Sequence, residues 1–254
     1  MFDNFFKAEI SGEVISSLIV MFIMMVLAVI VGIQARHQDP LKKPKGLLLV
    51  VELGVKFFDN FVYGLIGNRL PHLGGFIFGI AVYLFIAFIF GLTGLPSPIT
   101  YMAVPLSLGF TTFLMIHITS IRKTRWKYFK RYIDPLPFFL PINLISMWAP
   151  MLSLTLRLFG NAIAGWTLMT LAYSALEGLS STMFGFITAT FPDGGLVSGI
   201  FLAPILTPVL HAYFDLFSGV IQTTVFITLT TILLGNECPE EEEENMELSR
   251  KGGH

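Results

Sequence analysis

The sequence predicts an all-α polytopic membrane protein with about five membrane helices and one amphipathic helix at the membrane interface. Hydrophobic residues make up 54% of the 254 residues and charged residues 13%, whereas roughly a quarter of the residues of a soluble domain are charged. The mean hydropathy is +0.73, and several apolar runs reach the roughly 20 residues that a helix needs to cross a bilayer. We find no fixed-period repeat and no soluble domain, so residues 1–254 are interpreted as one membrane domain.

Lysine and arginine are concentrated in two short segments, which predict the orientation. Ten of the sixteen lie within residues 36–45 and 122–131, and short basic loops mark the cytoplasmic side. One inward crossing followed by a hairpin brings both loops to that side, with the N-terminus outside and the C-terminus in the cytoplasm. The acidic N-terminal region also argues against a cleaved signal peptide, which begins with positive charge.

The first half of the chain is divided by polar and proline residues. Residues 14–33 are predicted to form a plain spanning helix. In residues 46–69, polar groups interrupt Leu, Val and Phe at helical spacing, which favours an amphipathic helix on the cytoplasmic interface over a soluble packing helix. Residues 76–121 are expected to form a hairpin that turns at residues 95–98, where prolines end one helix and begin the next. Aromatic residues in the second basic segment suit an interfacial anchor, and nucleic-acid binding is not expected.

Two long apolar stretches complete the domain, at residues 138–176 and 196–235. Each is about twice as long as a perpendicular span, so each is either two helices or one long, strongly tilted helix. The lack of an internal charged loop favours the long tilted helices. A polar outer loop is expected at residues 177–195, and the tail at residues 236–254, with its five consecutive glutamates, is expected to be disordered.

Arg157 is the only lysine or arginine between Arg131 and Arg250, and it lies in apolar sequence. An arginine at mid-bilayer costs roughly 2.5–3.5 kcal/mol on insertion scales, and its guanidinium stays charged in proteins. Such a residue is a candidate functional site.

Small and polar residues surround this arginine at helical spacing. Those that recur every four residues share one helix face, namely Ser153, Arg157, Asn161 and Gly165. Gly160 and Ala164 lie beside them and keep the face shallow, which permits close approach of another helix, although small residues also serve ordinary helix packing.

A second polar stripe follows the last long stretch at i, i+4, i+7, i+8 and i+11. It consists of His211, Asp215, Ser218, Gly219 and Gln222. One stripe holds a cation and the other a carboxylate, so the two helices are expected to face each other. An Arg157–Asp215 ion pair that only neutralises both charges is the structural alternative to an ion pathway. Asn161 and Gln222 suit either helix packing or pathway lining, and His211 suits either a structural hydrogen bond or a proton relay.

Other site classes find no support. The sequence has no phosphate-binding glycine loop, no metal-ligand spacing and no Ser/His/Asp set outside the membrane. The single cysteine, Cys238, excludes an internal disulfide and a cysteine-based metal cluster. We expect no cofactor, no metal and no enzyme activity of the chain on its own.

The segment Ser153-Leu-Thr-Leu-Arg157-Leu-Phe-Gly-Asn161-Ala-Ile-Ala-Gly165 closely resembles the signature of subunit a of the F-type ATP synthase membrane sector. Pro141-Ile-Asn143-Leu, Ile221-Gln222-Thr-Thr-Val-Phe and the layout of nearly the whole chain fit the same family. The resemblance implies a proton-translocating stator in a bacterial plasma membrane, with the two long helices tilted against a ring of c subunits. Subunit b of the peripheral stalk, the rest of the synthase and the lipid bilayer are the other partners implied.

The resemblance also implies roles for individual residues. Arg157 would be the essential arginine between two offset aqueous half-channels, with Asn161 and Gln222 as its polar neighbours. A fixed cation attracts the ring's carboxylate, lowers its pKa and so favours proton release. Gly160 and Ala164 would pack against the ring.

The sequence departs from the family pattern at its carboxylates. Many bacterial members have a glutamate where this chain has Trp166, and another shortly after Pro-x-Asn, where it has Ser146; near the hairpin turn, Thr100 lies close to a common aspartate position. Asp215 is the sole carboxylate of the last helix, so we expect it to carry protons in the half-channel open to the outside. The other residues expected to line the pathway are Ser146, Ser153, Glu177, His211 and Ser218.

A membrane secondary transporter or another ion-driven motor stator is the second candidate class, because it too would need an intramembrane Arg/Asp pair. Transporters usually show paired repeats and broken helices, and we find neither pattern in the sequence.

Overall fold

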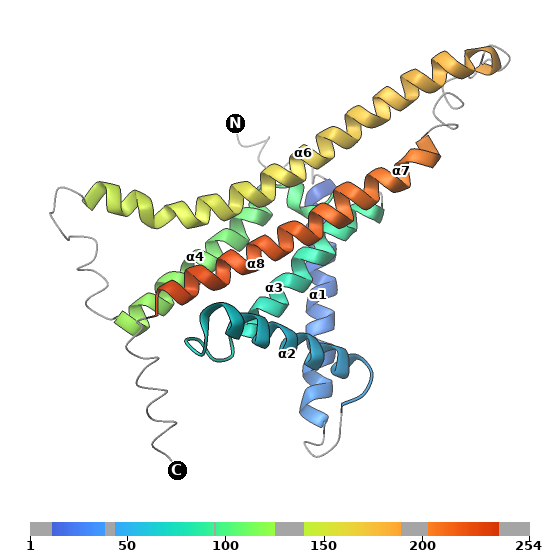
Figure 1. Cartoon of the computed structure of the whole chain (residues 1–254). Coiled ribbons are helices and arrows are strands. Elements are labelled where there is room, and N and C mark those ends of the chain that lie inside the picture. The colour runs from blue at the N-terminus through green and yellow to red at the C-terminus, as the bar shows by residue number, and fades with distance from the viewer. Residues whose placement is uncertain (1–11, 39–43, 94, 125–139, 189–202, 239–254) are drawn as a thin grey trace, which may run out of the picture.

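The computed structural model describes residues 12–38, 44–93, 95–124, 140–188 and 203–238, which form helices without a strand (Figure 1). The α-helices are α1 (Gly12–His37), α2 (Leu47–Ile66), α3 (Leu73–Ile89), α4 (Ala103–Thr124), α6 (Leu140–Thr188), α7 (Ala203–His211) and α8 (Ser218–Asn236). Short 3-10 turns, η1 (Phe90–Thr93) and η2 (Pro98–Thr100), lie between α3 and α4, and a π-helical segment, η4 (Ala212–Phe217), joins α7 to α8.

Four helical segments of the described chain are long and apolar enough to cross a membrane. They are Gly12–His37, Leu73–Thr93, Ala103–Lys123 and Leu206–Asn236. The fifth predicted membrane helix is α6, which has 49 residues and contains Arg157 and Asn161. The prediction of an all-α polytopic membrane protein is confirmed.

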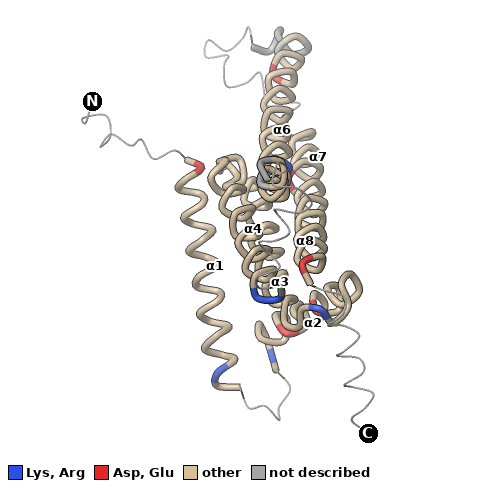
Figure 2. The backbone as a smooth tube through the Cα atoms, turned by 90° about the vertical axis from the view of Figure 1, so that its left-hand side faces the viewer, with Lys and Arg blue, Asp and Glu red and all other residues tan. Residues whose placement is uncertain are grey.

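Basic residues gather at one end of the bundle. The last turn of α1 contains Arg36 and His37, and the last turn of α4 contains Arg122 and Lys123. Figure 2 shows lysine and arginine positions near both of these helix ends and around α2, all toward the same end of the molecule. The two basic segments that the sequence predicts on one side of the membrane thus have described residues at the same end of the bundle.

Helix α2 lies across the bundle at this basic end (Figure 1). One face is buried at Val62 and Ile66, while Val50 and Phe57 on other faces are exposed. The backbones of α2 and α8 approach closely, since a Cβ added at Gly235 would collide with Ile66. This distribution of apolar residues suits the amphipathic helix predicted over residues 46–69.

The turn between α3 and α4 is closed by side-chain hydrogen bonds. Ser97 Oγ donates to the Ala87 carbonyl at 2.8 Å, and Thr100 Oγ1 donates to the Ser97 carbonyl at 2.6 Å. Ala87 lies in the last turn of α3, where backbone carbonyls lack helical partners, and the Ser97 carbonyl also accepts the Thr100 amide at 3.1 Å. The turn lies where the sequence predicted it.

Helix α3 is at the centre of the apolar core. Its side chains Ile77, Leu84 and Ala87 are fully buried, and α6 and α8 contribute Leu158 and Phe226 to the same cluster. The core therefore fixes the two long helices against the hairpin.

The two long helices run side by side, obliquely to α1 (Figure 1). α6 is continuous from Leu140 and contains Pro150; it ends at Thr188 rather than at residue 176, so the loop predicted at 177–195 is wrong as far as residue 188. The reason is local, because Gly178 and Gly185 each cost a helix only about 1 kcal/mol and no proline interrupts this part of the sequence. The second long helix consists of α7, η4 and α8 in direct succession.

Candidate functional site

A cavity of about 390 Å³ lies between α6, η4 and the turn of the α3–α4 hairpin, and we call it the first cavity. Both predicted polar stripes contribute to its walls. Its polar lining residues are Ser97, Thr100, Asn161, Thr170, Tyr173, His211, Asp215 and Ser218. The structure thus brings Asn161 of one stripe together with His211, Asp215 and Ser218 of the other, as the facing-helix prediction requires.

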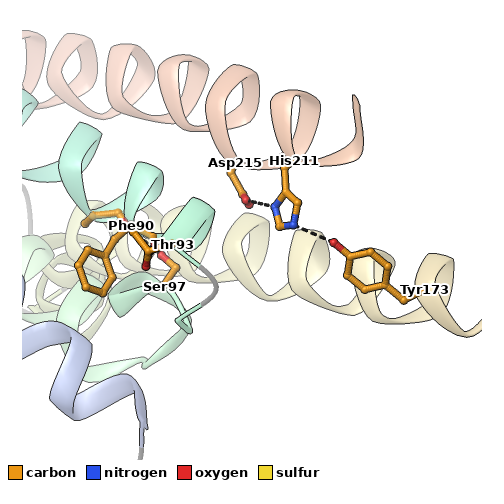
Figure 3. Close-up of polar contacts among 7 residues, drawn as sticks. Phe90, Thr93, Ser97, Tyr173, His211 and Asp215 are labelled. Atoms are coloured by element: carbon orange, nitrogen blue, oxygen red, sulfur yellow. Dashed lines mark hydrogen bonds and ion pairs between the residues drawn. The ribbon is translucent and has the colours of Figure 1, made fainter. Parts of the chain in front are cut away.

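Three of these side chains form a hydrogen-bonded chain across the first cavity. His211 Nδ1 lies 2.5 Å from Asp215 Oδ2, and His211 Nε2 lies 2.7 Å from the Tyr173 hydroxyl (Figure 3). The side chains of His211 and Asp215 are 28% and 23% exposed, so they remain accessible to water. Sequence reasoning missed Tyr173, although its spacing of twelve residues from Asn161 along one helix was visible.

Asp215 lies in the π-helical segment η4, in which the Ser218 amide donates to the Tyr213 carbonyl. π-helical turns inside α-helices occur frequently at functional sites. The hairpin turn closes the other side of the carboxylate, because a Cβ added at Gly91 would lie 3.4 Å from Asp215 Cγ. Residues far apart in sequence therefore position the carboxylate.

Arg157 lies in the middle of α6 and does not line the first cavity. Among the described residues it forms no ion pair with Asp215, whose Oδ2 contacts His211 Nδ1 instead, so the neutralising Arg157–Asp215 pair does not form. The Arg157 Nη1 atom is buried and finds no hydrogen-bond partner within the described chain, and the same is true of Gln222 Oε1. Buried polar groups are nearly always hydrogen-bonded, so each of these atoms needs a partner beyond the described residues.

The two faces of α6 differ in burial around Arg157. Leu154 and Leu158 are buried in the core, whereas Ser153 and Ala164 are exposed. A Cβ added at Gly160 would meet no atom within 4 Å. Ser153, Gly160 and Ala164 therefore point away from the rest of the subunit, whereas Asn161 and Gly165 of the predicted stripe line the first cavity.

A second cavity, of about 310 Å³, lies near the basic end of the bundle. It is formed by α4, the first part of α6 and the end of α8, and its polar lining residues are His117, Asn143, Ser146, Asn236 and Glu237. The structure therefore gives Ser146 a place in a cavity. His117 and Glu237 were not singled out from the sequence, although a histidine within an apolar hairpin is a signal for a functional site.

Three predicted pathway residues, Ser153, Glu177 and Gln222, line neither cavity. Gln222 is buried on α8. Ser153 is exposed on α6. Glu177 is also exposed and lies one turn beyond Tyr173, within α6 rather than in the predicted loop.

Comparison with known proteins places this geometry in a family context. The family described as the ATP synthase A chain matches residues 14–235. The ATP synthase subunit a of Mycoplasmoides gallisepticum is 29% identical over 228 residues, covering 86% of this chain and 75% of the relative. The subunit a of Bacillus subtilis is 30% identical over 199 residues, covering 72% and 77%. A sodium-ion-specific subunit a from Propionigenium modestum is 34% identical over 125 residues, covering 49% of this chain and 34% of the relative.

Proposed function

Because the chain belongs to the ATP synthase A chain family, we propose that it is the stator that guides protons past Arg157 to a rotating ring of c subunits. As a family member it is a multi-pass component of an F-type ATP synthase in a bacterial plasma membrane. The family membership decides against a secondary transporter. The proposal concerns the path of the proton and the residues that form it.

The arrangement of the two cavities along both long helices carries the proposal. Along α6, residues that line the second cavity come first, between 143 and 150. Arg157 follows, and residues that line the first cavity lie between 161 and 173. On the other long helix the order is reversed, and Gln222 lies between the cavities. Two offset cavities separated by a fixed cation suit a path in which the proton must leave one cavity on a carrier before it reaches the other.

Arg157 supplies the barrier and the attraction in this path. Its guanidinium stays charged in proteins, repels protons between the cavities and attracts an ionised ring carboxylate, whose pKa it lowers. Nη1 is buried without a partner within the described chain, whereas Arg157 as a whole is only half-buried, so the exposed part of its guanidinium donates to that carboxylate. Each charge that crosses the membrane gains roughly 2.3 kcal/mol per 100 mV, which is the energy available for rotation.

The first cavity is the half-channel open to the outside in this proposal, and the second opens to the cytoplasm. His117 of the second cavity lies on α4, whose last turn contains Arg122 and Lys123 at the basic end. The first cavity lies at the opposite end of α4, at the hairpin turn. Asp215 supplies the negative charge that draws protons into the first cavity.

The ring packs against the exposed face of α6 in this proposal. Gly160 and Ala164 allow its outer helices to approach Arg157 closely, because small residues bring helix backbones together. Subunit b and the rest of the synthase bind other surfaces of the chain.

Cysteine labelling from each side of the membrane tests the two cavities. Ser218→Cys and Ser146→Cys are introduced separately into a Cys238→Ser background of the complete complex, and a membrane-impermeant maleimide is added to either side of oriented vesicles. We expect Ser218→Cys to react only from the outside and Ser146→Cys only from the cytoplasm. Leu158→Cys is the control that should react from neither side, since Leu158 is 1% exposed. Reaction of both test positions from the same side would contradict the proposal.

A further inference from the structure

We infer, on the premise that the first cavity is the outer half-channel, that Tyr173, His211 and Asp215 bind the incoming proton as one hydrogen-bonded unit. In this unit His211 accepts the proton. Asp215 holds the imidazole of His211 in one tautomer, and Tyr173 positions the second nitrogen of the imidazole. The unit deepens the role given to Asp215, because the carboxylate acts through the imidazole rather than as an isolated acid.

The geometry assigns the resting hydrogen bonds. A neutral imidazole has one donor and one acceptor nitrogen, and a carboxylate can only accept. The contact of 2.5 Å between Nδ1 and Asp215 Oδ2 therefore requires the proton on Nδ1. Nε2 is then the acceptor, and the Tyr173 hydroxyl, 2.7 Å away, donates to it.

Proton uptake follows from this arrangement without any other reagent. A proton from cavity water adds to Nε2, and the Tyr173 hydroxyl rotates so that its oxygen accepts the new N–H. The ring becomes an imidazolium, and the Asp215 carboxylate balances its positive charge. Nε2 then loses the same proton to water beside the carboxylate of the c ring, and the imidazole returns to its resting state. A carboxylate that orients and stabilises a histidine in this way keeps its own charge throughout.

No other charged side chain of the described residues shares the first cavity with this unit. The hairpin turn contributes Gly91, Ser97 and Thr100, which do not titrate in the physiological range, and α6 contributes Tyr173 as its only titratable group there. Arg157 lies outside the lining. Because the proton affinity of a coupled pair belongs to the pair, His211 and Asp215 are best tested together.

The unit also connects the two long helices, since Tyr173 comes from α6 and its partners come from α7 and η4. The alignment of His211 therefore depends on the distance between these helices. Tyr173→Phe keeps the aromatic ring of residue 173 in the cavity and removes only the hydroxyl. It therefore tests the positioning of His211 without a change in packing.

The test is proton-driven ATP synthesis by the complete complex in proteoliposomes, measured over a series of luminal pH values at fixed membrane potential. His211→Gln keeps a polar side chain of similar length but cannot carry the proton, and we expect synthesis at neutral luminal pH to fall about 100-fold, as on loss of a general acid–base group. A carboxylic acid titrates at lower pH than an imidazole, so activity of this variant should return only in a more acidic lumen. Tyr173→Phe should give a smaller loss with a shift in the same direction.

Tyr213→Phe is the matched control, because Tyr213 is 57% exposed and lies outside the first cavity. It should keep the wild-type rate and pH profile. Wild-type profiles in both His211→Gln and Tyr173→Phe would overturn the inference. Asp215→Asn separates this from a failure of the proposed function: if Asp215→Asn is slow while the other two are normal, only the relay is wrong, and if all three are normal, the first cavity is not the proton path.

Discussion

Trp166 on α6 and Asp215 on η4 line the same cavity from two different helices. Trp166 occupies the position at which many bacterial relatives of the predicted type have a glutamate, and Asp215 is the sole carboxylate of the last helix. The cavity therefore retains one negative charge although that charge is attached to the opposite helix. In the proposed function, this is how the outer half-channel stays acidic without a glutamate at position 166.

A glutamate restored at position 166 should therefore compensate for the loss of Asp215. Asp215→Asn is expected to slow proton uptake about 100-fold or more, because it removes the charge that stabilises the imidazolium of His211, and losing a general acid–base function typically costs that much. Adding Trp166→Glu should recover part of that loss, because both side chains face the same water. ATP-driven fluorescence quenching in inverted vesicles measures both variants. A double variant as slow as Asp215→Asn alone would show that the position next to His211, rather than the cavity's charge, is what matters.

Arg157→Ala should abolish ATP-coupled proton pumping while leaving the subunit in the membrane. The variant removes the only cation between the two cavities, so protons should also leak passively once the soluble sector is stripped off. Arg157→Lys should fail largely as well, since an ammonium is a point charge that cannot reproduce the planar guanidinium donors. Pumping and passive flux are measured on the same vesicles, with immunoblots as the control for assembly. Normal coupled pumping in Arg157→Lys would contradict the role proposed for Arg157.

The exposed face of α6 should tolerate only small residues. Ala164→Trp is expected to uncouple or stall rotation, because a bulky side chain separates Arg157 from the ring carboxylate and Coulomb attraction falls with distance. Ala164→Ser should be mild. Rotation-dependent ATP hydrolysis and proton pumping report the effect.

Disulfide crosslinking tests the orientation of the same face. Cysteine at position 164 should crosslink with cysteines on the outer helix of the c ring, whereas cysteine at Leu158 should not, since Leu158 is buried in the subunit core. Crosslinks from position 158 alone would mean that α6 presents the other face.

Much of this fold could be predicted from hydrophobic runs and charge. Spans, hairpin and long helices depend on local composition, so α1 and the turn at Ser97 lie where the sequence indicated. The end of α6 could not be predicted, because the polarity of Glu177 and Gly178 is typical of a loop. A helix continues through such residues as long as its backbone hydrogen bonds continue. The π-helical segment around Asp215 has no sequence signature.

The candidate site was predictable only where its residues share one helix. The stripes through Arg157 and Asp215 follow from helical periodicity, whereas the Tyr173–His211 contact joins two helices and depends on their crossing. The second cavity depends on three helices for the same reason, so His117 and Glu237 could be placed in it only by the tertiary structure.

Two glycines on the long helices should respond to valine in opposite ways. A Cβ added at Gly219 would lie 2.7 Å from Phe88 Cβ, so valine overpacks the contact between α8 and α3, which typically costs about 1–3 kcal/mol. A Cβ added at Gly160 would meet nothing within 4 Å, so valine there leaves the subunit itself undisturbed. We therefore expect Gly219→Val to lower the amount of subunit found in membranes, and Gly160→Val to leave that amount unchanged while coupled pumping falls, because only the ring meets the added methyl groups. Immunoblotting and proton pumping on the same membranes separate the two effects. If Gly160→Val pumps normally, the shallow face of α6 does not contact the ring, and the surface that does must be sought elsewhere on the two long helices.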